Sequence, residues 1–305
     1  SLNLVRSQGL NLGYGNNLDL AYLLGASPTM RIYKPENLGG YAGPNQAETG
    51  INNRDNIVGR RDNNRHNTTN NNILGGLFAE YTIIPGLKYK LNLGLNNGLN
   101  TGKTYLGIFQ MDNRSNLRQS LSQSRNIANE YLMENTLTYE KVFHDNYAVN
   151  LLAGYTQQNA LYSTMSGSKQ DFPSNEIQVF DAGTGPSVIG GNDAAWALRS
   201  YLGRANVTFF DKYLLTATIR RDGSSRFGKE NKYGNFPSFA VGWNIDREKF
   251  MQNIGAISML KLRASWGQLG NQEIGNYESQ TTISTTPQYI FGATQSIASA
   301  AAVLS

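Results

Sequence analysis

The sequence contains no cysteine and only two histidines, His66 and His144. The absence of cysteine excludes disulfide bonds, zinc-thiolate sites and cysteine nucleophiles. Two isolated histidines give little support to a metal cluster or to a base that activates a nucleophile. No paired-carboxylate motif is present either, so we expect no enzymatic activity and no bound metal or cofactor.

Charged residues and long apolar runs are also scarce. Charged residues make up 16% of the 305 residues, and the net charge is +5. The longest apolar stretch runs from Ile297 to Leu304, which is too short for a membrane-spanning helix. An integral membrane protein with this sequence would therefore be a β-barrel. The chain opens at Ser1 without a charged or apolar leader, so we expect that a signal peptide has been removed or that the sequence is an excerpt.

In place of charge, the chain is rich in asparagine, glycine and tyrosine. It has 32 Gly and 17 Tyr, together with about 36 Asn, a mixture far from average usage. Asparagine and glycine are poor helix formers but suit turns, whereas tyrosine suits strands. The composition therefore favours an all-β fold.

Period-two alternation is the clearest local pattern. From Leu87 to Leu95 every odd position is apolar and every even position is not. This predicts a strand with one apolar and one polar face. Similar runs recur in pairs joined by short turns, and we interpret each pair as a hairpin. The predicted hairpins are 73–84 with 87–95, 131–139 with 147–155, 201–209 with 213–219, and 239–245 with 260–266, and a further strand is predicted near 277–291.

Short and long connections alternate along these strands. The links within hairpins are short, as at Pro85-Gly86, His144-Asp145-Asn146 and Asp211-Lys212. The links between hairpins are long: Gly98 to Ala128, Gln157 to Trp196, and Gly223 to Asn235. This alternation is typical of outer-membrane barrels, which have short periplasmic turns and long outer loops. A soluble antiparallel sheet with one buried face is the alternative interpretation.

Aromatic residues bracket several of the apolar faces. Eight residues at about 3.3 Å each, tilted near 40°, cover roughly 20 Å of membrane depth. That distance matches the separation between the two aromatic girdles of a membrane barrel. The sequence therefore predicts a lipid-facing girdle formed by Tyr131, Tyr139, Tyr147, Tyr155, Tyr201 and Phe209. Asn135 falls inside one of these bands, and the pattern does not explain it.

Two segments superficially suggest nucleotide or nucleic-acid binding. Gly98 to Thr104 resembles a phosphate-binding loop, but it has one residue too few between its glycines. Arg60-Arg61 and Arg65 form a local basic group without an accompanying stacking motif. We therefore expect no nucleic-acid partner.

Three segments carry a family resemblance. Residues 213–228, 233–243 and 260–272 resemble, in this order, the signature of the SusC/RagA family of TonB-dependent outer-membrane transporters. Weaker similarity runs through residues 27–41 and 80–88. The resemblance covers nearly the whole chain.

The resemblance implies an importer in the outer membrane of Bacteroidota. It implies a barrel of about 22 strands, plugged by an N-terminal domain and capped by a SusD-like lipoprotein. Such a transporter takes up oligosaccharides or peptides with energy delivered through TonB. We interpret residues 1–71 as a long extracellular loop region, 72–292 as strands and loops of an up-and-down transmembrane barrel segment, and 293–305 as the start of a further loop. We expect the plug domain and the segment that contacts TonB to lie outside this sequence, which we interpret as an internal portion of a longer transporter.

Site residues are expected at the outer rim and in the long loops. Asp222 is expected to pair with a neighbouring arginine in a polar network that shapes the rim, with direct substrate contact as the alternative. The rim residues are Arg220, Arg221, Asp222, Gly223, Ser224, Ser225, Arg226, Phe227 and Gly228. Phe172, Phe180 and Trp196 are candidates for stacking on sugar rings or for holding peptide side chains, with packing inside the loops as the alternative.

Two functions from different classes remain open at this point. The first is the transporter segment, in which odd positions from 87 to 95 face lipid, even positions face the lumen, and the long loops recognise the lipoprotein and the substrate. The second is a soluble or surface-anchored β-rich module that binds carbohydrate. A plug domain upstream would belong only to the first.

Overall fold

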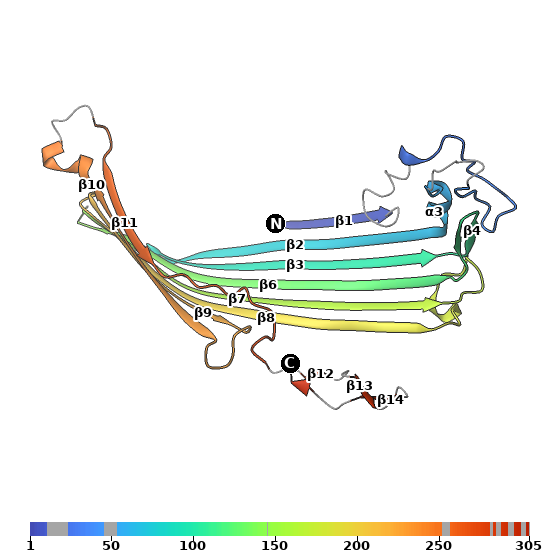
Figure 1. The fold of residues 1–305 in the computed structure, drawn as a ribbon. Helices are drawn as coiled ribbons and strands as arrows, with labels where there is room; N and C mark the ends of the chain where they lie inside the picture. The colour runs from blue at the N-terminus through green and yellow to red at the C-terminus, as the bar shows by residue number, and fades with distance from the viewer. Residues whose placement is uncertain are drawn as a thin grey trace. The chain divides into compact units, whose positions relative to one another are not determined.

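Long strands make up most of the protein. The computed structural model describes residues 1–10, 24–45, 54–144, 146–251 and 257–280, together with the backbone of short strands between 283 and 304. Within this part, nine strands form one sheet in the order β1-β2-β3-β6-β7-β8-β9-β10-β11 (Figure 1). Their bounds are Leu2–Leu10 (β1), Asn64–Ile84 (β2), Leu87–Leu106 (β3), Ser120–Phe143 (β6), Tyr147–Gln170 (β7), Ser187–Phe209 (β8), Tyr213–Ser224 (β9), Tyr233–Asn244 (β10) and Lys261–Gly267 (β11).

Shorter strands form three separate pairs. Phe109–Met111 (β4) pairs with Arg114–Asn116 (β5), and Gln288–Phe291 (β13) pairs with Ser296–Ser299 (β14). Ile283–Ser284 (β12) pairs with Val303–Leu304 (β15). The strand predicted near 277–291 therefore differs from the structure, because the backbone described there forms β12 and β13 outside the large sheet. Much of the predicted loop 293–305 lies outside the described residues.

The long strands exceed the length that a bilayer requires. Strands β6 and β7 have 24 residues each, whereas a tilted strand crosses the apolar layer with about 9–11 residues. The connections are correspondingly shorter than the sequence predicts. They span 107–119 and 171–186, in place of Gly98 to Ala128 and Gln157 to Trp196. The polar flanks are strands because neighbouring strands complete their backbone hydrogen bonds, even where neither face is apolar.

The chain divides into two compact units. Unit 1 comprises Ser1–Gly75, Leu95–Glu130 and Leu161–Ala194. Unit 2 comprises Gly76–Gly94, Tyr131–Ala160 and Ala195–Ser305. Each unit contains a portion of β2, β3, β6, β7 and β8, and each is described by itself below.

In unit 2, the turn between β2 and β3 requires glycine. Gly86 has a φ of +86°, a conformation that side chains with a Cβ rarely adopt. A Cβ atom at this position would lie 2.4 Å from the carbonyl oxygen of Glu140. The backbone is held there because Glu140 N–H donates a 2.8 Å hydrogen bond to Gly86 O. The sequence pair Pro85-Gly86 thus forms the predicted turn and also contacts the end of β6.

The remaining turns of unit 2 are also linked to one another by backbone hydrogen bonds. Phe210 N–H donates to Asn146 O at 2.7 Å, which joins the β8–β9 turn to the β6–β7 turn. Asn244 N–H donates to Lys212 O at 2.8 Å, which joins the end of β10 to the β8–β9 turn. Asp145, which the sequence places in the β6–β7 turn, lies outside the described residues.

In unit 1, a short helix precedes β2. This helix, Ile57–Asn63 (α3), is capped by Asn56, whose side-chain oxygen accepts hydrogen bonds from two amides of the first turn. The same side chain donates to the carbonyl oxygens of Ile32 at 2.7 Å and Ala42 at 2.9 Å. Asn56 is buried, so these bonds satisfy its polar atoms and fix the helix to the segment 24–45.

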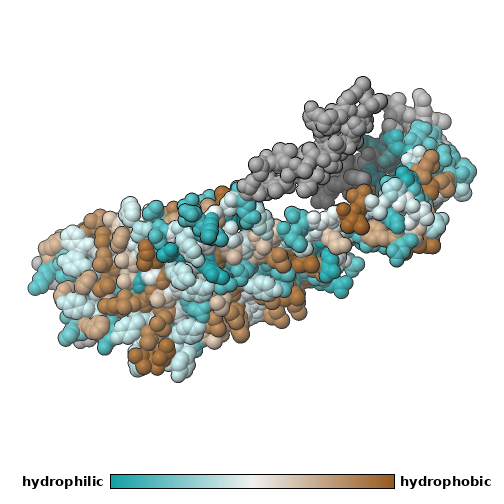
Figure 2. Space-filling view, turned by 90° about the horizontal axis from the view of Figure 1, so that it is seen from below, coloured by the Kyte–Doolittle hydropathy of each residue, from teal (hydrophilic) through white to brown (hydrophobic). Residues whose placement is uncertain are grey.

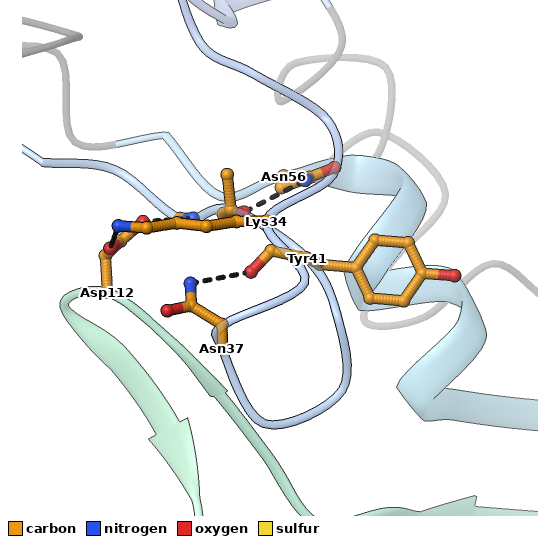
Figure 3. A network of polar contacts seen from close by, with 7 residues as sticks. Lys34, Asn37, Tyr41, Asn56 and Asp112 are labelled. Carbon is orange, nitrogen blue, oxygen red and sulfur yellow. Dashed lines mark hydrogen bonds and ion pairs between the residues drawn. The ribbon is translucent and has the colours of Figure 1, made fainter.

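The same segment is fixed to the β4–β5 hairpin by an ion pair (Figure 3). Lys34 Nζ contacts the carboxylate of Asp112, and Gly43 N–H donates to that carboxylate at 2.8 Å. Burial alone raises the pKa of Asp112, but these two hydrogen bonds outweigh it and hold the pKa below its usual range. Asn37 donates to Tyr41 O at 2.9 Å and closes the loop beneath the pair.

The N-terminal 71 residues thus contain regular structure that alternation does not predict. Strand β1 pairs antiparallel with β2 from Leu2 opposite Gly75 to Leu10 opposite Asn67. Strand β1 is held by this pairing and α3 by the hydrogen bonds of Asn56, and neither contact requires a strict hydrophobic period. Among the described helices, none combines the length and the apolar character that crossing a membrane demands.

Candidate functional site

Unit 2 presents an apolar face formed by the odd positions of its strands and the even positions of β11. The register places Ala205 opposite Ala217 and Ala217 opposite Phe239, so adjacent strands share the alternation. Large side chains on this face are open: Leu151 is 43% exposed, Phe239 52% and Trp266 60%. Figure 2 shows hydrophobic residues at the surface, interleaved with hydrophilic ones. A soluble protein rarely leaves so many large apolar side chains uncovered.

The aromatic residues predicted to form a girdle lie at odd positions of β6, β7 and β8. They are Tyr131, Tyr139, Tyr147, Tyr155, Tyr201 and Phe209. The rings of Tyr155 and Tyr201 pack with centroids 5.3 Å apart, and those of Tyr147 and Phe209 with centroids 5.9 Å apart. These contacts align the aromatic positions of neighbouring strands. Their location at a lipid boundary stays a prediction.

Asn135, which the sequence pattern leaves unexplained, has a partner on the neighbouring strand. Tyr89 on β3 donates a 2.6 Å hydrogen bond from its hydroxyl to Asn135 Oδ1 on β6. Both residues lie at odd positions, so the bond is made on the apolar face itself. A polar group in an apolar setting is tolerated when it is hydrogen-bonded. The bond gives the Tyr89 hydroxyl an acceptor and Asn135 Oδ1 a donor.

The opposite face of unit 2, at even positions, carries a row of hydrogen-bonded polar side chains. Asn150 donates to Glu140 and accepts from Asn206 at 3.5 Å, and Thr216 donates to Asn206 at 2.9 Å. We call these four residues the polar ladder, and it crosses from β6 to β9. Asn92 and Glu134 form a similar pair at 3.2 Å. This face suits contact with water and polar solutes.

Unit 1 continues the polar character at its even positions. Asn100 donates to Asn70 and accepts from Asn126 at 3.3 Å, so three neighbouring strands share one row of amides. Tyr162 donates its hydroxyl hydrogen to Glu130 on the next strand. Amide and carboxylate groups of this kind can exchange hydrogen bonds with sugar hydroxyls or with peptide groups.

The predicted pairing of Asp222 with a neighbouring arginine is present in unit 2, and its place at the outer rim stays a prediction. Arg220 Nε donates to both carboxylate oxygens of Asp222, at 2.7 and 2.9 Å. Arg220 also donates to Ser200 Oγ at 3.2 Å from the neighbouring strand, and Ser200 is buried. The Arg221 guanidinium lies 5.0 Å from the ring centre of Tyr233.

The turn after β9 falls later than the sequence predicts. Gly223 and Ser224 are the last residues of β9, and the connection spans 225–232 with Phe227 and Gly228 inside it. Ser225 exchanges two 2.9 Å hydrogen bonds with Ala197 on β8. A Cβ at Gly223 would lie 2.3 Å from the Tyr233 ring, so this glycine permits the close approach of the tyrosine.

Arg226 links three segments that are far apart in the sequence. Its guanidinium carbon lies 5.4 Å from the ring centre of Trp196, Nε donates to Asn276 at 2.9 Å, and Nη1 donates to Gln272 O at 3.2 Å. Trp196, predicted to lie in a long loop, is instead a residue of β8. Its ring supports Arg226, and the segment after β11 is held beside the same group.

The two phenylalanines proposed as substrate contacts lie in unit 1. Phe172 is 5% exposed and packs edge-on against Tyr105, with ring centroids 5.7 Å apart, in a core completed by Leu121. Phe172 therefore fills a core, as the packing alternative expects. Phe180, in the short helix Phe180–Ala182 (η1), is partly exposed beside that core and lines a pocket.

A second polar cluster lies in the β10–β11 connection of unit 2. Glu248 accepts hydrogen bonds from Lys212 at 2.8 Å, Tyr213 at 2.7 Å and Trp243 at 3.1 Å. The hydrogen bonds from Lys212, Tyr213 and Trp243 lower the pKa of Glu248 to about 2. This carboxylate joins the ends of β9 and β10. Across the part of the chain that the structure describes, no group of His, Asp and Glu could hold a metal ion.

No family model matches the chain, but individual proteins do. It is 35% identical over 207 residues to "TonB-dependent receptor P39" of Formosa agariphila, a match covering 66% of this chain and 20% of the relative. It is 51% identical over 79 residues to "TonB-dependent receptor SusC" of Bacteroides thetaiotaomicron, covering 26% of this chain and 8% of the relative. The solved RagAB peptide transporter matches with a TM-score of 0.71 at 21% identity, over 82% of this chain and 27% of that one.

The receptor matches taken together, SusC among them, decide the family. The chain belongs to the SusC/RagA family of TonB-dependent receptors. The fold shared with RagAB identifies the nine-stranded sheet as similar to part of the barrel wall of that transporter. The matches of this SusC/RagA chain span 20% of receptor P39, 8% of SusC and 27% of the solved RagAB chain.

Several interacting residues of this SusC/RagA chain have no clear sequence signal. The pair of Tyr89 and Asn135 depends on strand register, which alternation does not specify across different hairpins. Glu248 accepts hydrogen bonds from Tyr213 of β9 and Trp243 of β10, and a lone glutamate in a connection gives no sequence signal for either contact. The position of Arg226 inside a signature motif is the one available hint for its network.

Proposed function

We propose that this chain forms part of the wall of an active importer in the cell outer membrane. The importer takes up oligosaccharides or peptides, draws energy through TonB, and works with a SusD-like lipoprotein. The observation that carries the proposal is the two-faced sheet of unit 2. Its odd face is apolar and open, and its even face carries the polar ladder. A transporter wall needs both, because one face meets lipid and the other meets a watery lumen.

The alternative of a soluble carbohydrate-binding module is less compatible with the same observation. Such a module would cover its apolar face with a second layer of structure. In the described part of unit 2, Leu151, Phe239 and Trp266 are uncovered. The receptor relatives favour the importer as well.

The proposal assigns recognition to the rim and the connections. The Arg220–Asp222 pair and Arg226 give the rim a fixed shape, and the connection 171–186 carries Phe180 at a pocket. We propose that these parts, with the region 1–71, lie on the outer side near the lipoprotein. RagAB is named as a peptide transporter, which supports peptides as one substrate class alongside oligosaccharides.

The first test asks which face meets lipid. Single cysteines at Leu91, Leu93 and Asn92 in the full-length transporter would be exposed to a lipid-soluble reagent and to a membrane-impermeant one. We expect the lipid-soluble reagent to modify the two odd positions and the polar reagent to modify Asn92→Cys. Preferential modification of Asn92→Cys by the lipid-soluble reagent would contradict the assignment.

The second test concerns import itself. Cells that carry the full-length transporter would be given labelled oligosaccharides and labelled peptides, with and without a functional TonB. We expect uptake of at least one class that stops when TonB is removed, and a lipoprotein that co-purifies with the transporter. Uptake that persists without TonB, or a transporter that purifies alone from native membranes, would overturn the corresponding part of the proposal.

A further inference from the structure

Unit 1 contains a pocket of about 640 Å³, lined in part by Phe180, whose ligand the import function does not specify. Its floor is formed chiefly by odd positions of β3, β6 and β7, and Phe180 from the connection 171–186 forms one wall. The amide row of Asn70, Asn100 and Asn126 lies at even positions and is therefore on the other face of these strands. The pocket is thus a separate site.

Three cations line this pocket. Lys103 donates to the neutral carbonyl oxygen of Gln178 at 2.8 Å, and it forms no ion pair with the carboxylates that the structure describes. Arg125 is exposed and Lys169 is half-buried, and neither makes a hydrogen bond or ion pair with the residues that the structure describes. Glu176 and Asp181 belong to the covering connection, but they are not among the lining residues. The pocket therefore concentrates positive charge.

The remaining lining suits a sugar better than a simple ion. Hydroxyl groups from Thr69, Thr101 and Ser168 supply donors and acceptors of the kind that sugar hydroxyls need. Phe180 and Met165 supply apolar surface, and an aromatic ring suits the C–H face of a pyranose. A volume of about 640 Å³ is far larger than a lone phosphate and lies within the range of small-molecule sites.

We propose that this pocket binds an anionic saccharide, one that carries phosphate or carboxylate groups. Arg125 and Lys169 contact the anionic groups, and Phe180 packs against the sugar ring. Two sources could supply this chemistry. One is the phosphorylated sugar of lipopolysaccharide, since the pocket lies chiefly at odd positions of strands whose odd positions in unit 2 are mostly apolar. The other is a free acidic oligosaccharide. The proposal does not depend on import, so binding rather than uptake is measured.

The test uses the purified full-length transporter and four probes. These are lipopolysaccharide, the same lipopolysaccharide after dephosphorylation, oligogalacturonate and a neutral maltooligosaccharide. The variant Arg125→Gln with Lys169→Gln removes two charges from the pocket. The matched control, Lys229→Gln with Lys249→Gln, removes two charges from exposed lysines of unit 2 outside the pocket. A swap of the cations, Arg125→Lys with Lys169→Arg, keeps the charge.

We expect the pocket variant to bind an anionic probe roughly tenfold more weakly, since two charge-assisted contacts are lost. The control and the swap should bind nearly as the unmodified protein does, and added salt should weaken binding.

Loss of binding on dephosphorylation identifies the lipid source, and binding of oligogalacturonate identifies the free source. The proposal is overturned if neither anionic probe binds, if the neutral sugar binds as tightly as the anionic probes, or if the pocket variant and the control behave alike. Retention of the folded barrel by circular dichroism ensures that a loss of binding is local.

Discussion

Odd-numbered side chains of the same strands have different characters in the two units. In unit 2 most of them are apolar or aromatic, as at Leu151 and Tyr201, and the amide of Asn135 is bonded to Tyr89. In unit 1 the odd positions of β3, β6 and β7 include Lys103, Arg125 and Lys169. The alternation along a strand fixes which face of the sheet a side chain occupies. The types of side chain on that face indicate whether its surroundings are apolar or polar. On the proposed function, this difference predicts lipid beside the odd positions of unit 2 and water beside those of unit 1.

The largest expected effect comes from placing a charge on the apolar face of unit 2. Leu151→Arg should lower the free energy of unfolding by about 2–4 kcal/mol, because the guanidinium would sit near the bilayer midplane. Asn150→Arg, on the polar face, should cost far less. Met165→Arg, at an odd position of unit 1, should change stability by only about 0.5 kcal/mol, as exposed substitutions usually do. Denaturant titration of the full-length transporter in lipid vesicles measures all three, and equal costs at Leu151 and Met165 would break the comparison.

A glycine substitution should have the next largest effect. Gly86→Ala should cost about 1–3 kcal/mol, because the φ of +86° is unfavourable for alanine. The Cβ would also collide with Glu140 O. Gly190→Ala in unit 1 meets nothing closer than 4.0 Å and should be nearly neutral. The same vesicle titration tests the pair, and a neutral Gly86→Ala would show that the turn can rearrange.

A smaller effect is expected from the hydrogen bond on the apolar face. Tyr89→Phe leaves Asn135 Oδ1 without its donor, which should cost about 1–2 kcal/mol. Adding Asn135→Leu should restore most of that loss, since both polar groups are then gone. In unit 1, Thr164→Val removes a 3.2 Å bond to Asn192 O at an exposed site, where water can replace it. If the double variant is no more stable than Tyr89→Phe alone, Asn135 does not lie in an apolar setting.

The smallest effect should appear only in acid. The pKa of Glu248 is lowered to about 2, so its stabilising contribution is complete above the unfolded value of about 4.3. That contribution is lost as the pH falls from about 4.3 toward 2. Glu248→Gln should therefore flatten the dependence of the melting temperature on pH in this window. Asp171→Asn in unit 1 should flatten it less, because Arg118 is the side-chain donor that lowers the pKa of Asp171, whereas three side chains donate to Glu248. An unchanged slope for Glu248→Gln would contradict the role of this cluster.

The same contrast explains how far sequence reasoning reached. Strands such as Leu87–Leu95 were predictable because an apolar environment on one side imposes period two. The polar strand segments of unit 1, such as Ser120–Glu130, have no apolar side and therefore read as loops. Their strand structure comes from backbone pairing with neighbours, which composition does not record.

The polar contacts of Asp222 and Arg226 could be predicted from the sequence only in part. The pairing of Asp222 with a neighbouring arginine was expected from opposite charges close together in the sequence. The structure adds that the partner is Arg220, two residues away on the same side of β9. The support of Arg226 by Trp196 and Asn276 joins residues 30 or more positions apart, and no local pattern reports such a distance. The burial of Phe172 was equally hidden, because its partners Tyr105 and Leu121 come from two other strands.

The backbone hydrogen bonds that the turns of unit 2 make have a practical consequence for modifying the protein. Gly86 is bonded to Glu140, Asn146 to Phe210, and Lys212 to Asn244. An epitope tag inserted at any one of these turns would therefore also strain the turn or strand end to which that turn is hydrogen-bonded. Insertions for detection or immobilisation are better placed in the exposed part of the β9–β10 connection, around Lys229 and Glu230.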